Sequence, residues 1–416
     1  MNYTKHFQTK VTPQSEPVPG KPMVKNEAGG FVFAVDDWVR LDRFLVLGSE
    51  GGTYYVSEKK MTVDNAQAVQ RCIQADGPRT VNRIIEISDT GRAPKNDPAL
   101  FALAMCAGMG DKDTRRLALE ALPNVARIGT HLFHFATYVE GFRGWGRGLR
   151  QAVGNWYLEK KVEDLAYQTV KYQQRDGWSH RDLLRLSHPK TDDLSRNALF
   201  EWIVKGEGDI AGKDDLALIE GFERVKVADN KKLVAGLIET YNLPREAIPT
   251  QWLNEVEVWE AMLSKMPLTA LIRNLGKMTG IGLLKPMSKA VGLVIDKLGQ
   301  QDYIRKSRLH PLAILIALKV YQQGHGEKGS LKWSPVGKIV DALDEAFYLA
   351  FGNVEPTGKR LMLGLDVSGS MSFPFGRTPV SCCEGATAMA MVTAKTEQNW
   401  VITRFNQGIE TIPITP

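Results

Sequence analysis

The sequence predicts a mainly α-helical protein, an α-solenoid of HEAT-like helical repeats followed by a partial α/β domain. Three observations support this fold class. Amphipathic segments with helical spacing of their apolar residues recur to about residue 351, and such helix pairs must stack to bury their apolar faces. A turn-rich linker, Glu355-Pro356-Thr357-Gly358, then interrupts the pattern. Behind it, a strand, a helix and a second strand follow as a β-α-β unit.

Length and composition are those of an ordinary globular protein. The 416 residues suffice for two or three domains, and 43% hydrophobic with 24% charged residues allow a sizeable core to be buried. No apolar run is long enough for a membrane helix, and residues 1–28 lack the apolar region of a secretory signal. The four cysteines show no zinc spacing, and a net charge of +6 permits a polyanionic partner. We therefore expect a cytoplasmic protein without a membrane partner.

Residues 1–28 are expected to form a flexible tail, with order beginning at Gly29. Two β-prone stretches come first, at residues 31–35 and 52–56, and the pattern turns helical from about residue 64. Asp97 followed by Pro98 is typical of an N-capped helix start, and it opens an apolar run. Further helical segments are expected at residues 113–122, 129–142, 182–187, 196–204, 252–265, 268–275 and 336–351.

The α/β domain is expected to span residues 356–416. Residues 360–365 form an apolar strand that ends on Asp366, residues 384–395 a helix, and residues 399–404 a second strand. We expect this domain to be incomplete at its carboxyl end, with an open edge on the second strand.

The most specific local signal is the loop Asp366-Val-Ser368-Gly-Ser370, which directly follows the first of these strands. A hard divalent cation prefers oxygen ligands that converge from one tight loop at the carboxyl end of a strand. Loops of this D-x-S-x-S type form the metal-ion-dependent adhesion site of von Willebrand A domains, which makes Mg²⁺ the candidate ion for this loop. The alternative is a strand-to-helix turn whose hydroxyls cap the next helix.

Positive charge concentrates in residues 141–191, here called the basic segment. Ten Lys and Arg stand against five Asp and Glu, which gives +5 of the chain's net +6. Lys171 and Arg175, four residues apart, are expected to share a helix face. Aromatic faces beside cations suit stacked single-stranded bases and phosphates, but a solvated basic face over core tryptophans explains the same pattern. The interleaved rings are Trp145, Trp156, Tyr157, Tyr172, Trp178, His180 and His188.

Other constellations lack a catalytic or metal motif. Residues 276–280 do not have the residue order of a phosphate-binding loop. His131 and His134 could ligate a metal, yet no acidic residue joins them in the local motif, so they are interpreted as ordinary helix residues. The adjacent Cys382 and Cys383 are interpreted as packing residues. We therefore expect that the protein is not an enzyme.

Six stretches in one unbroken order, over about residues 28–416, resemble the Ro ribonucleoprotein autoantigen family and its bacterial members. They are RLDRFLVLGSEGGTYY at 40–55, WGRGL at 145–149, KYQQRDGWSHRDLLRLSHPK at 171–190, PLTALIRNLGKMT at 267–279, RLHPLAILIALKVYQQGHG at 308–326 and VEPTGKRLMLGLDVSGSM at 354–371.

The resemblance implies a TROVE module, a closed ring of helical repeats over residues 29–355, followed by a von Willebrand A domain. Members bind small non-coding Y RNAs on the outer surface of the ring and pass the single-stranded 3′ ends of misfolded RNAs through its hole. Bacterial members tether Y RNA to the exoribonuclease polynucleotide phosphorylase. For this chain it implies RNA quality control or a stress response without catalysis, with Y RNA and other structured non-coding RNAs as partners and no DNA.

The resemblance also assigns site residues. Three match the family's positions for Y RNA contact: Lys171, Arg175 and His188. Four neighbours are added from charge and spacing alone: Arg147, Arg150, Arg181 and Lys190. The family's complete metal site uses a threonine and an aspartate from two later loops as well, so the site of this chain is expected to be incomplete, with three ligands: Asp366, Ser368 and Ser370.

Two other functions compete with RNA binding. A protein-interaction scaffold would use the solenoid as a peptide binder and the A domain as a metal-dependent adhesion module, which requires a complete metal site. A nuclease would require an acidic metal cluster, and the sequence does not show one.

Overall fold

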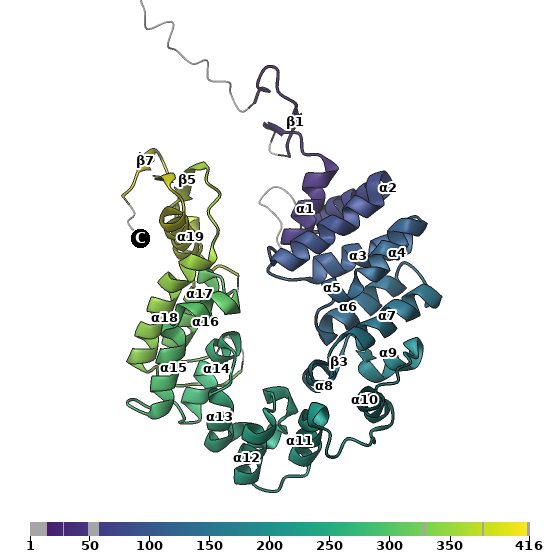
Figure 1. The fold of residues 1–416 in the computed structure, drawn as a ribbon. Helices are drawn as coiled ribbons and strands as arrows, with labels where there is room; N and C mark the ends of the chain where they lie inside the picture. Colours follow the sequence, from purple (N-terminus) through teal and green to yellow (C-terminus); the bar gives the residue numbers. More distant parts are fainter. Residues whose placement is uncertain (1–14, 28, 49–57, 327–328, 377, 414–416) are drawn as a thin grey trace, which may run out of the picture. The chain divides into compact units, whose positions relative to one another are not determined.

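The computed structural model describes residues 15–27, 29–48, 58–326, 329–376 and 378–413, with the side chains of residues 58–65 excepted. Two compact units divide the chain, residues 1–220 and 221–416, and each is described by itself. Both consist mainly of helices, drawn from purple to teal in the first unit and from teal to yellow in the second (Figure 1). A mainly α fold followed by a small α/β part is thereby confirmed, while ring closure stays a prediction. Within these ranges no helix has both the length and the apolar composition that a bilayer crossing requires.

The first unit begins with two short strands and continues with helices. Its elements are β1 (Met23–Lys25), β2 (Phe31–Phe33), α1 (Asp37–Leu47), α2 (Glu58–Thr90), α3 (Asp97–Met109), α4 (Lys112–Glu120), α5 (Leu122–Val125), α6 (Gly129–Glu140), α7 (Arg147–Glu159), α8 (Val162–Lys171), β3 (Gln174–Arg175), β4 (Trp178–Ser179), α9 (His180–Ser187), α10 (Leu194–Lys205), the 3₁₀ turn η2 (Asp214–Leu216) and α11 (Ala217–Lys226), which crosses into the second unit.

Strands β1 and β2 form an antiparallel hairpin in which Val24 lies opposite Val32. The β-prone stretch at residues 31–35 is confirmed, since β2 lies within it. The flexible tail was expected to reach residue 28, and this is wrong because residues 23–25 pair with β2. Residues 1–14 of that tail, and the second β-prone stretch at 52–56, lie outside the described residues.

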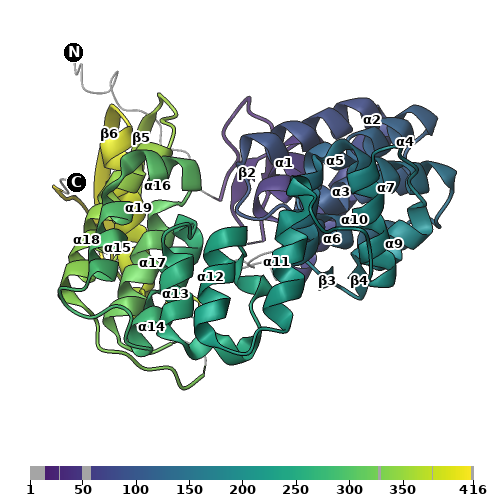
Figure 2. The same ribbon diagram turned by 60° about the horizontal axis from the view of Figure 1, so that its bottom comes forward.

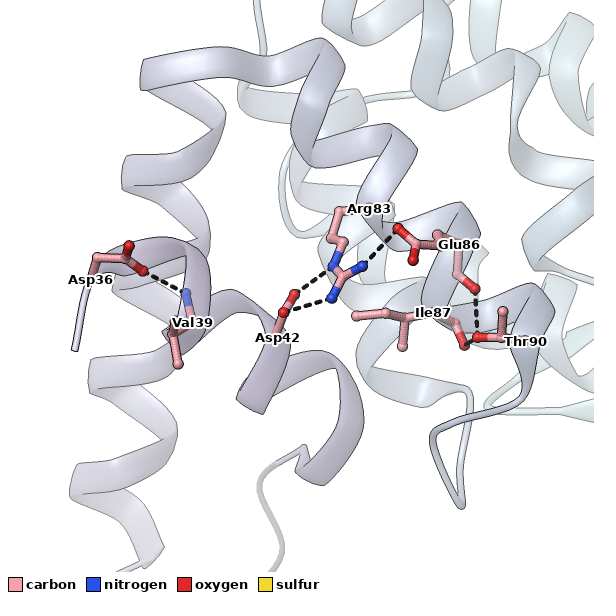
Figure 3. Close-up of polar contacts among 7 residues, drawn as sticks. All are labelled: Asp36, Val39, Asp42, Arg83, Glu86, Ile87 and Thr90. Atoms are coloured by element: carbon pink, nitrogen blue, oxygen red, sulfur yellow. Dashed lines mark hydrogen bonds and ion pairs between the residues drawn. The ribbon is translucent and has the colours of Figure 1, made fainter. Parts of the chain in front are cut away.

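Helix α1 begins where the Asp36 carboxylate accepts a hydrogen bond from the backbone N–H of Val39 at 2.8 Å, an N-cap shown in Figure 3. Its apolar side packs on α2. The buried residues of α1 are Leu41, Phe44 and Leu45. Loss of water from these side chains supplies most of the energy that holds the two helices together.

Arginines of α2 fix how α1 lies on it. The Arg83 guanidinium donates from Nε and Nη2 to both oxygens of Asp42, at 2.7 Å each, and from Nη1 to Glu86 at 2.7 Å (Figure 3). Arg71 forms the same two-bond pair with Asp37, at 2.8 Å each. Two parallel bonds determine orientation, whereas their net energy is small because these side chains are partly exposed to water.

Helix α2 bends at Asp76, whose φ of −159° and ψ of 87° are not helical. The Asp76 carboxylate accepts a hydrogen bond from the backbone N–H of Arg79 at 3.0 Å, and Pro78 follows in the first turn, so a new helix in effect starts here. Gly77 lies against α4, where an added Cβ would stand 1.9 Å from Oγ1 of Thr114. Only glycine allows this approach.

Helix α3 is buried on nearly all sides between α2 and α6. The expected helix is confirmed, with one difference at its start. Asn96, rather than Asp97, occupies the cap position, and its side chain donates to the carbonyl of Val125 at 2.8 Å instead of capping the helix. Pro98 lies in the first turn, as expected.

The second unit continues with helices and ends in a small sheet. Its elements are α12 (Lys231–Tyr241), η3 (Arg245–Ala247), η4 (Thr250–Asn254), α13 (Val256–Leu263), α14 (Leu268–Gly280), α15 (Lys289–Gly299), α16 (Gln301–Ser307), α17 (Pro311–Gln322), α18 (Gly337–Leu349), η5 (Ala350–Asn353), β5 (Arg360–Asp366), η6 (Gly369–Ser372), α19 (Cys382–Thr396), β6 (Asn399–Phe405) and β7 (Ile409–Thr411).

Lys297 of α15 is buried at the end of α13. Its Nζ donates to the carbonyls of Leu263 at 2.8 Å, Ser264 at 2.8 Å and Met266 at 3.2 Å. The ammonium group therefore satisfies carbonyls that the end of a helix leaves without an intrahelical partner. Burial lowers the pKa of Lys297 from its ordinary value.

The expected β-α-β unit is confirmed. Strands β5 and β6 pair in parallel with Leu363 opposite Ile402, α19 lies between them in sequence, and Figure 2 shows all three together. Strand β7 pairs antiparallel with β6, so the edge expected to be open is partly covered. Helix α19 covers one sheet face with a small core: Leu365, Ala390, Ala394 and Ile402.

Polar contacts join this α/β part to the helices of the second unit. Lys319 of α17 forms an ion pair with Glu384 of α19 at 2.8 Å. The carboxylate of Glu397, just after α19, accepts a hydrogen bond from the backbone N–H of Gly358 at 3.1 Å, within the predicted linker. The linker is therefore held at Gly358 by the residue that follows α19, while the ion pair joins α19 to α17.

Candidate nucleic-acid interface

The basic segment forms α7, α8, α9 and the hairpin β3–β4 of the first unit. Of the seven residues expected to contact RNA, Lys171 is half-buried. Its Nζ donates to the Tyr167 hydroxyl at 2.9 Å and lies 5.4 Å from the ring of Tyr172. The other six are exposed and can reach a ligand: Arg147, Arg150, Arg175, Arg181, His188 and Lys190.

Two further cations of the basic segment have structural partners. Arg143 donates from Nη1 to the carbonyl of Ala107 at 2.9 Å, which ties it to α3. Lys160 lies over the Trp156 ring, 4.5 Å from its centroid, and donates to the carbonyl of Arg127 at 3.3 Å. Burial lowers the pKa of Lys160. The sequence count of +5 therefore overstates the charge that is offered to a ligand.

The chain reverses direction shortly after Lys171. Helix α8 ends at this residue, and Arg175 lies in β3, directly opposite Trp178 of β4. Asp176 and Gly177 form the turn with φ of 52° and 82°, the Asp-Gly turn that suits a two-residue hairpin. The expectation that Lys171 and Arg175 share a helix face is wrong, because the turn signal outweighs their helical spacing.

His134 of α6 holds the tip of this hairpin. Its Nδ1 contacts the carboxylate of Asp176, and its Nε2 lies 3.7 Å from Asp97. His131, one turn earlier in α6, lies 3.4 Å from the side-chain nitrogen of Asn96, and burial lowers its pKa to about 4. The two histidines thus have different hydrogen-bond partners. No group of three or more His, Cys, Asp or Glu suited to a metal ion occurs in the described part of the chain.

Two half-buried indoles lie beside Arg175. The rings of Trp145 and Trp178 are 5.4 Å apart at 53°, and Trp178 faces Arg175 across the hairpin. The carbonyl of Trp145 accepts a hydrogen bond from Nε of Arg150 at 3.1 Å, and Arg147 begins α7 two residues further on. We call Trp145 and Trp178 the aromatic pair. The structure thus pairs Arg175 with Trp178 and holds Arg150 on the backbone of Trp145, while the contact between the two indoles has no signal in the sequence.

Other aromatic residues of the basic segment belong to the core. Trp156 and Tyr157 are 0% exposed and His180 is 3% exposed, so none of them can stack on a base. The Tyr157 hydroxyl hydrogen-bonds Nδ1 of His180 at 2.9 Å. Burial lowers the pKa of His180 to about 4, although the backbone carbonyls of Gln168 and Tyr172 act in the opposite direction. For these three rings the core interpretation of the sequence pattern is correct.

Helix α9 presents further cations to solvent. It starts with a capping box, in which Ser179 and Asp182 each accept a hydrogen bond from the other's backbone N–H, at 3.3 Å and 3.0 Å. Arg181 and Arg185 are exposed and one helical turn apart, so they share a face. Arg185 was not among the residues singled out from the sequence, although its spacing from Arg181 could have indicated it. His188 ends the helix with a φ of 47°.

The Asp366 loop brings its three expected ligands together. The backbone N–H of Ser368 donates to Asp366 at 2.8 Å, which lowers the pKa of this carboxyl, and the hydroxyls of Ser368 and Ser370 are 3.0 Å apart. Three hard oxygen donors suit Mg²⁺, but they include a single carboxylate charge. These residues would hold the ion, and its binding stays a prediction.

Comparison with known proteins finds relatives over most of the chain. Residues 24–320 match the family model described as the TROVE domain, and residues 360–416 match the one described as the Ro60 vWA domain. The RNA-binding protein RO60 of Deinococcus radiodurans is 42% identical over 412 residues, which cover 97% of this chain and 76% of that protein. The RNA-binding protein RO60 of Caenorhabditis elegans is 36% identical, over 94% of this chain and 73% of that protein.

A solved structure supports the same relationship. The crystal structure of the Deinococcus radiodurans RO (RSR) protein superposes with a TM-score of 0.82 at 41% identity, covering 92% of this chain and 77% of that one. Sequence and fold therefore agree over both parts of the chain, and the chain belongs to the family of TROVE-domain Ro proteins.

Proposed function

We propose that this chain binds RNA through the basic segment, as a non-catalytic protein of RNA quality control or of a stress response. Three observations carry the proposal: Arg175 lies opposite Trp178, Arg150 contacts the backbone of Trp145, and exposed Arg147 begins the same helix as Arg150. Guanidinium groups pair with phosphates, and partly exposed indoles accept unstacked bases, which is how single-stranded parts of an RNA are recognised. The names of both relatives, which describe RNA-binding proteins, support it.

The resemblance supports a more specific ligand. Small non-coding Y RNAs and the 3′ ends of misfolded RNAs are the RNAs we propose, with contacts from the exposed cations of α7, α9 and the hairpin. Polynucleotide phosphorylase would join through Y RNA and supply the nuclease activity, in the cytoplasm. Purified chain should therefore leave RNA intact in the presence of Mg²⁺; cleavage that EDTA abolishes would contradict the non-catalytic part.

Salt-dependent titration of a Y-type RNA tests the binding surface. The variant Arg147→Gln/Arg150→Gln/Arg175→Gln should bind more weakly, and the slope of log K against log salt should become shallower by about 2 to 3, since each lost phosphate contact accounts for roughly 0.7–0.9.

The matched control removes the same charge from exposed positions of the second unit, in the variant Lys289→Gln/Arg305→Gln/Lys306→Gln. It should bind as the unmodified chain does. Unchanged affinity and slope in the first variant, or an equal loss in both variants, would refute the assignment of the surface.

A further inference from the structure

The second unit contains a large cavity, and none of the residues that line it belongs to the basic segment. It has a volume of about 830 Å³ and is lined by residues of η3, η4, α13, α14 and α17, and by Gly326, Leu331 and Trp333, which follow α17. This volume lies within the range of cavities that enclose small organic ligands. None of the functions derived above uses it.

One wall of the cavity is a fixed aromatic surface. The indole Nε1 of Trp333 donates to the carbonyl of Tyr321 at 2.9 Å, and the two rings stack at 19° with centroids 6.1 Å apart. The Tyr321 hydroxyl is itself 2.9 Å from the hydroxyl of Thr279. Gly276 of α14 also lies against this ring, where an added Cβ would stand 2.7 Å from the indole. The Trp333 ring is therefore held in place as a flat wall.

Charge in the cavity has one sign. Arg245, Arg273 and Lys277 contribute to its lining, and the described residues that line it include no Asp or Glu. Lys277 is directed by a hydrogen bond from Nζ to the side-chain oxygen of Asn254, at 2.6 Å. The rest of the lining is mostly apolar, for example Ile316 of α17. Such a site is complementary to an anion that carries a flat, largely apolar ring.

We propose that this cavity binds one unstacked nucleotide, with its base against the Trp333 wall and its phosphate held by Arg273 and Lys277. Stacking on an aromatic side chain is open to every base, and guanidinium and ammonium groups both bind phosphate. The nucleotide can be free or can belong to a single-stranded RNA; only the second source rests on the proposed function.

The proposal is tested by titrating the intact chain with 5′-AMP, 5′-UMP, the matching nucleosides and a six-residue oligouridylate. Binding is measured by the change in tryptophan fluorescence. Saturable binding of a nucleotide or of the oligonucleotide is expected, with nucleosides about tenfold weaker or more, because they lack the phosphate. Binding of the mononucleotides would show that a free nucleotide is a sufficient ligand. If the oligonucleotide binds and the mononucleotides do not, the ligand is a nucleotide within an RNA strand.

Two variants and two controls locate the site. Arg273→Gln should lower the affinity about tenfold, and Ala317→Phe, which fills the cavity from α17, should abolish binding. Arg305→Gln removes an exposed charge outside the cavity and should change nothing. The Arg147→Gln/Arg150→Gln/Arg175→Gln variant should bind mononucleotides normally, so a failed RNA surface and a failed cavity give different results. Absence of binding at millimolar concentration, or binding that folded Arg273→Gln and Ala317→Phe variants retain, would overturn the proposal.

Discussion

Acid should destabilise the first unit through its buried histidines. His180 is neutral in the folded chain, with a pKa of about 4 against 6.5 for an ordinary histidine, because burial opposes its charged form. The unfolded chain therefore binds a proton that the folded chain does not, between pH 6.5 and 4. The stabilisation is complete above pH 6.5 and is lost as the pH falls toward 4.

The size of this loss follows from the two pKa values of His180, about 4 in the folded chain and 6.5 ordinarily. A pKa difference of about 2.5 corresponds to roughly 3 kcal/mol of unfolding free energy, of which about 2 kcal/mol is lost by pH 5. His131, whose pKa is also lowered by burial and by Arg127, is only partly buried and should add a smaller loss. Urea unfolding followed by circular dichroism at pH 7 and pH 5 measures the sum.

A double variant isolates the contribution of His180. In Tyr157→Phe/His180→Phe both partners of the hydrogen bond between the Tyr157 hydroxyl and Nδ1 of His180 become apolar, so neither of these two atoms is left without its partner. Its loss of unfolding free energy from pH 7 to pH 5 should be about 2 kcal/mol smaller than that of the unmodified chain. The control His325→Gln, at an exposed position, should leave the loss unchanged. A double variant that loses as much as the unmodified chain would refute the reasoning.

Two further predictions concern single positions. Lys297→Met should lower the free energy of unfolding by about 1–3 kcal/mol, because three carbonyls lose their donor. Lys289→Met, at an exposed position of the same helix, should have little effect in the same urea titration. Equal effects of the two variants would contradict the buried role of Lys297. Gly177→Ala should destabilise the β3–β4 hairpin by about 1–2 kcal/mol, because the φ of 82° at this position disfavours a side chain. Backbone hydrogen exchange should then become faster in residues 174–179. Unchanged exchange there would contradict the hairpin.

Much of the fold could be predicted because local signals and tertiary packing agree. In the β-α-β unit around Asp366 and in the helix after Asp97, the spacing of the apolar residues and the turn or capping residues at the ends indicate the same structure. The predicted ends of helices and strands were less accurate where single hydrogen bonds determine them. Asn96 replaces Asp97 at the cap position, and residues 23–25 pair as a strand although nothing in their composition marks them.

The candidate site was harder to predict because it is assembled from separate elements. Charge density located the basic segment, but it could not separate exposed Arg147 from Arg143, which the carbonyl of Ala107 holds. Aromatic content likewise could not distinguish Trp156 in the core from Trp145 beside the hairpin. Which of these residues is exposed depends on which elements pack against them. These packing partners are distant in the sequence, so a local pattern does not show them.

Crosslinking of RNA to the chain in cells, followed by sequencing of the RNA and by identification of the crosslinked peptides, tests the central claim most directly. The account predicts small structured non-coding RNAs, attached to peptides of residues 141–191 and above all to Trp145, Trp178 or their neighbours. Recovery of no RNA above background, or of crosslinks confined to peptides outside the basic segment, would contradict it.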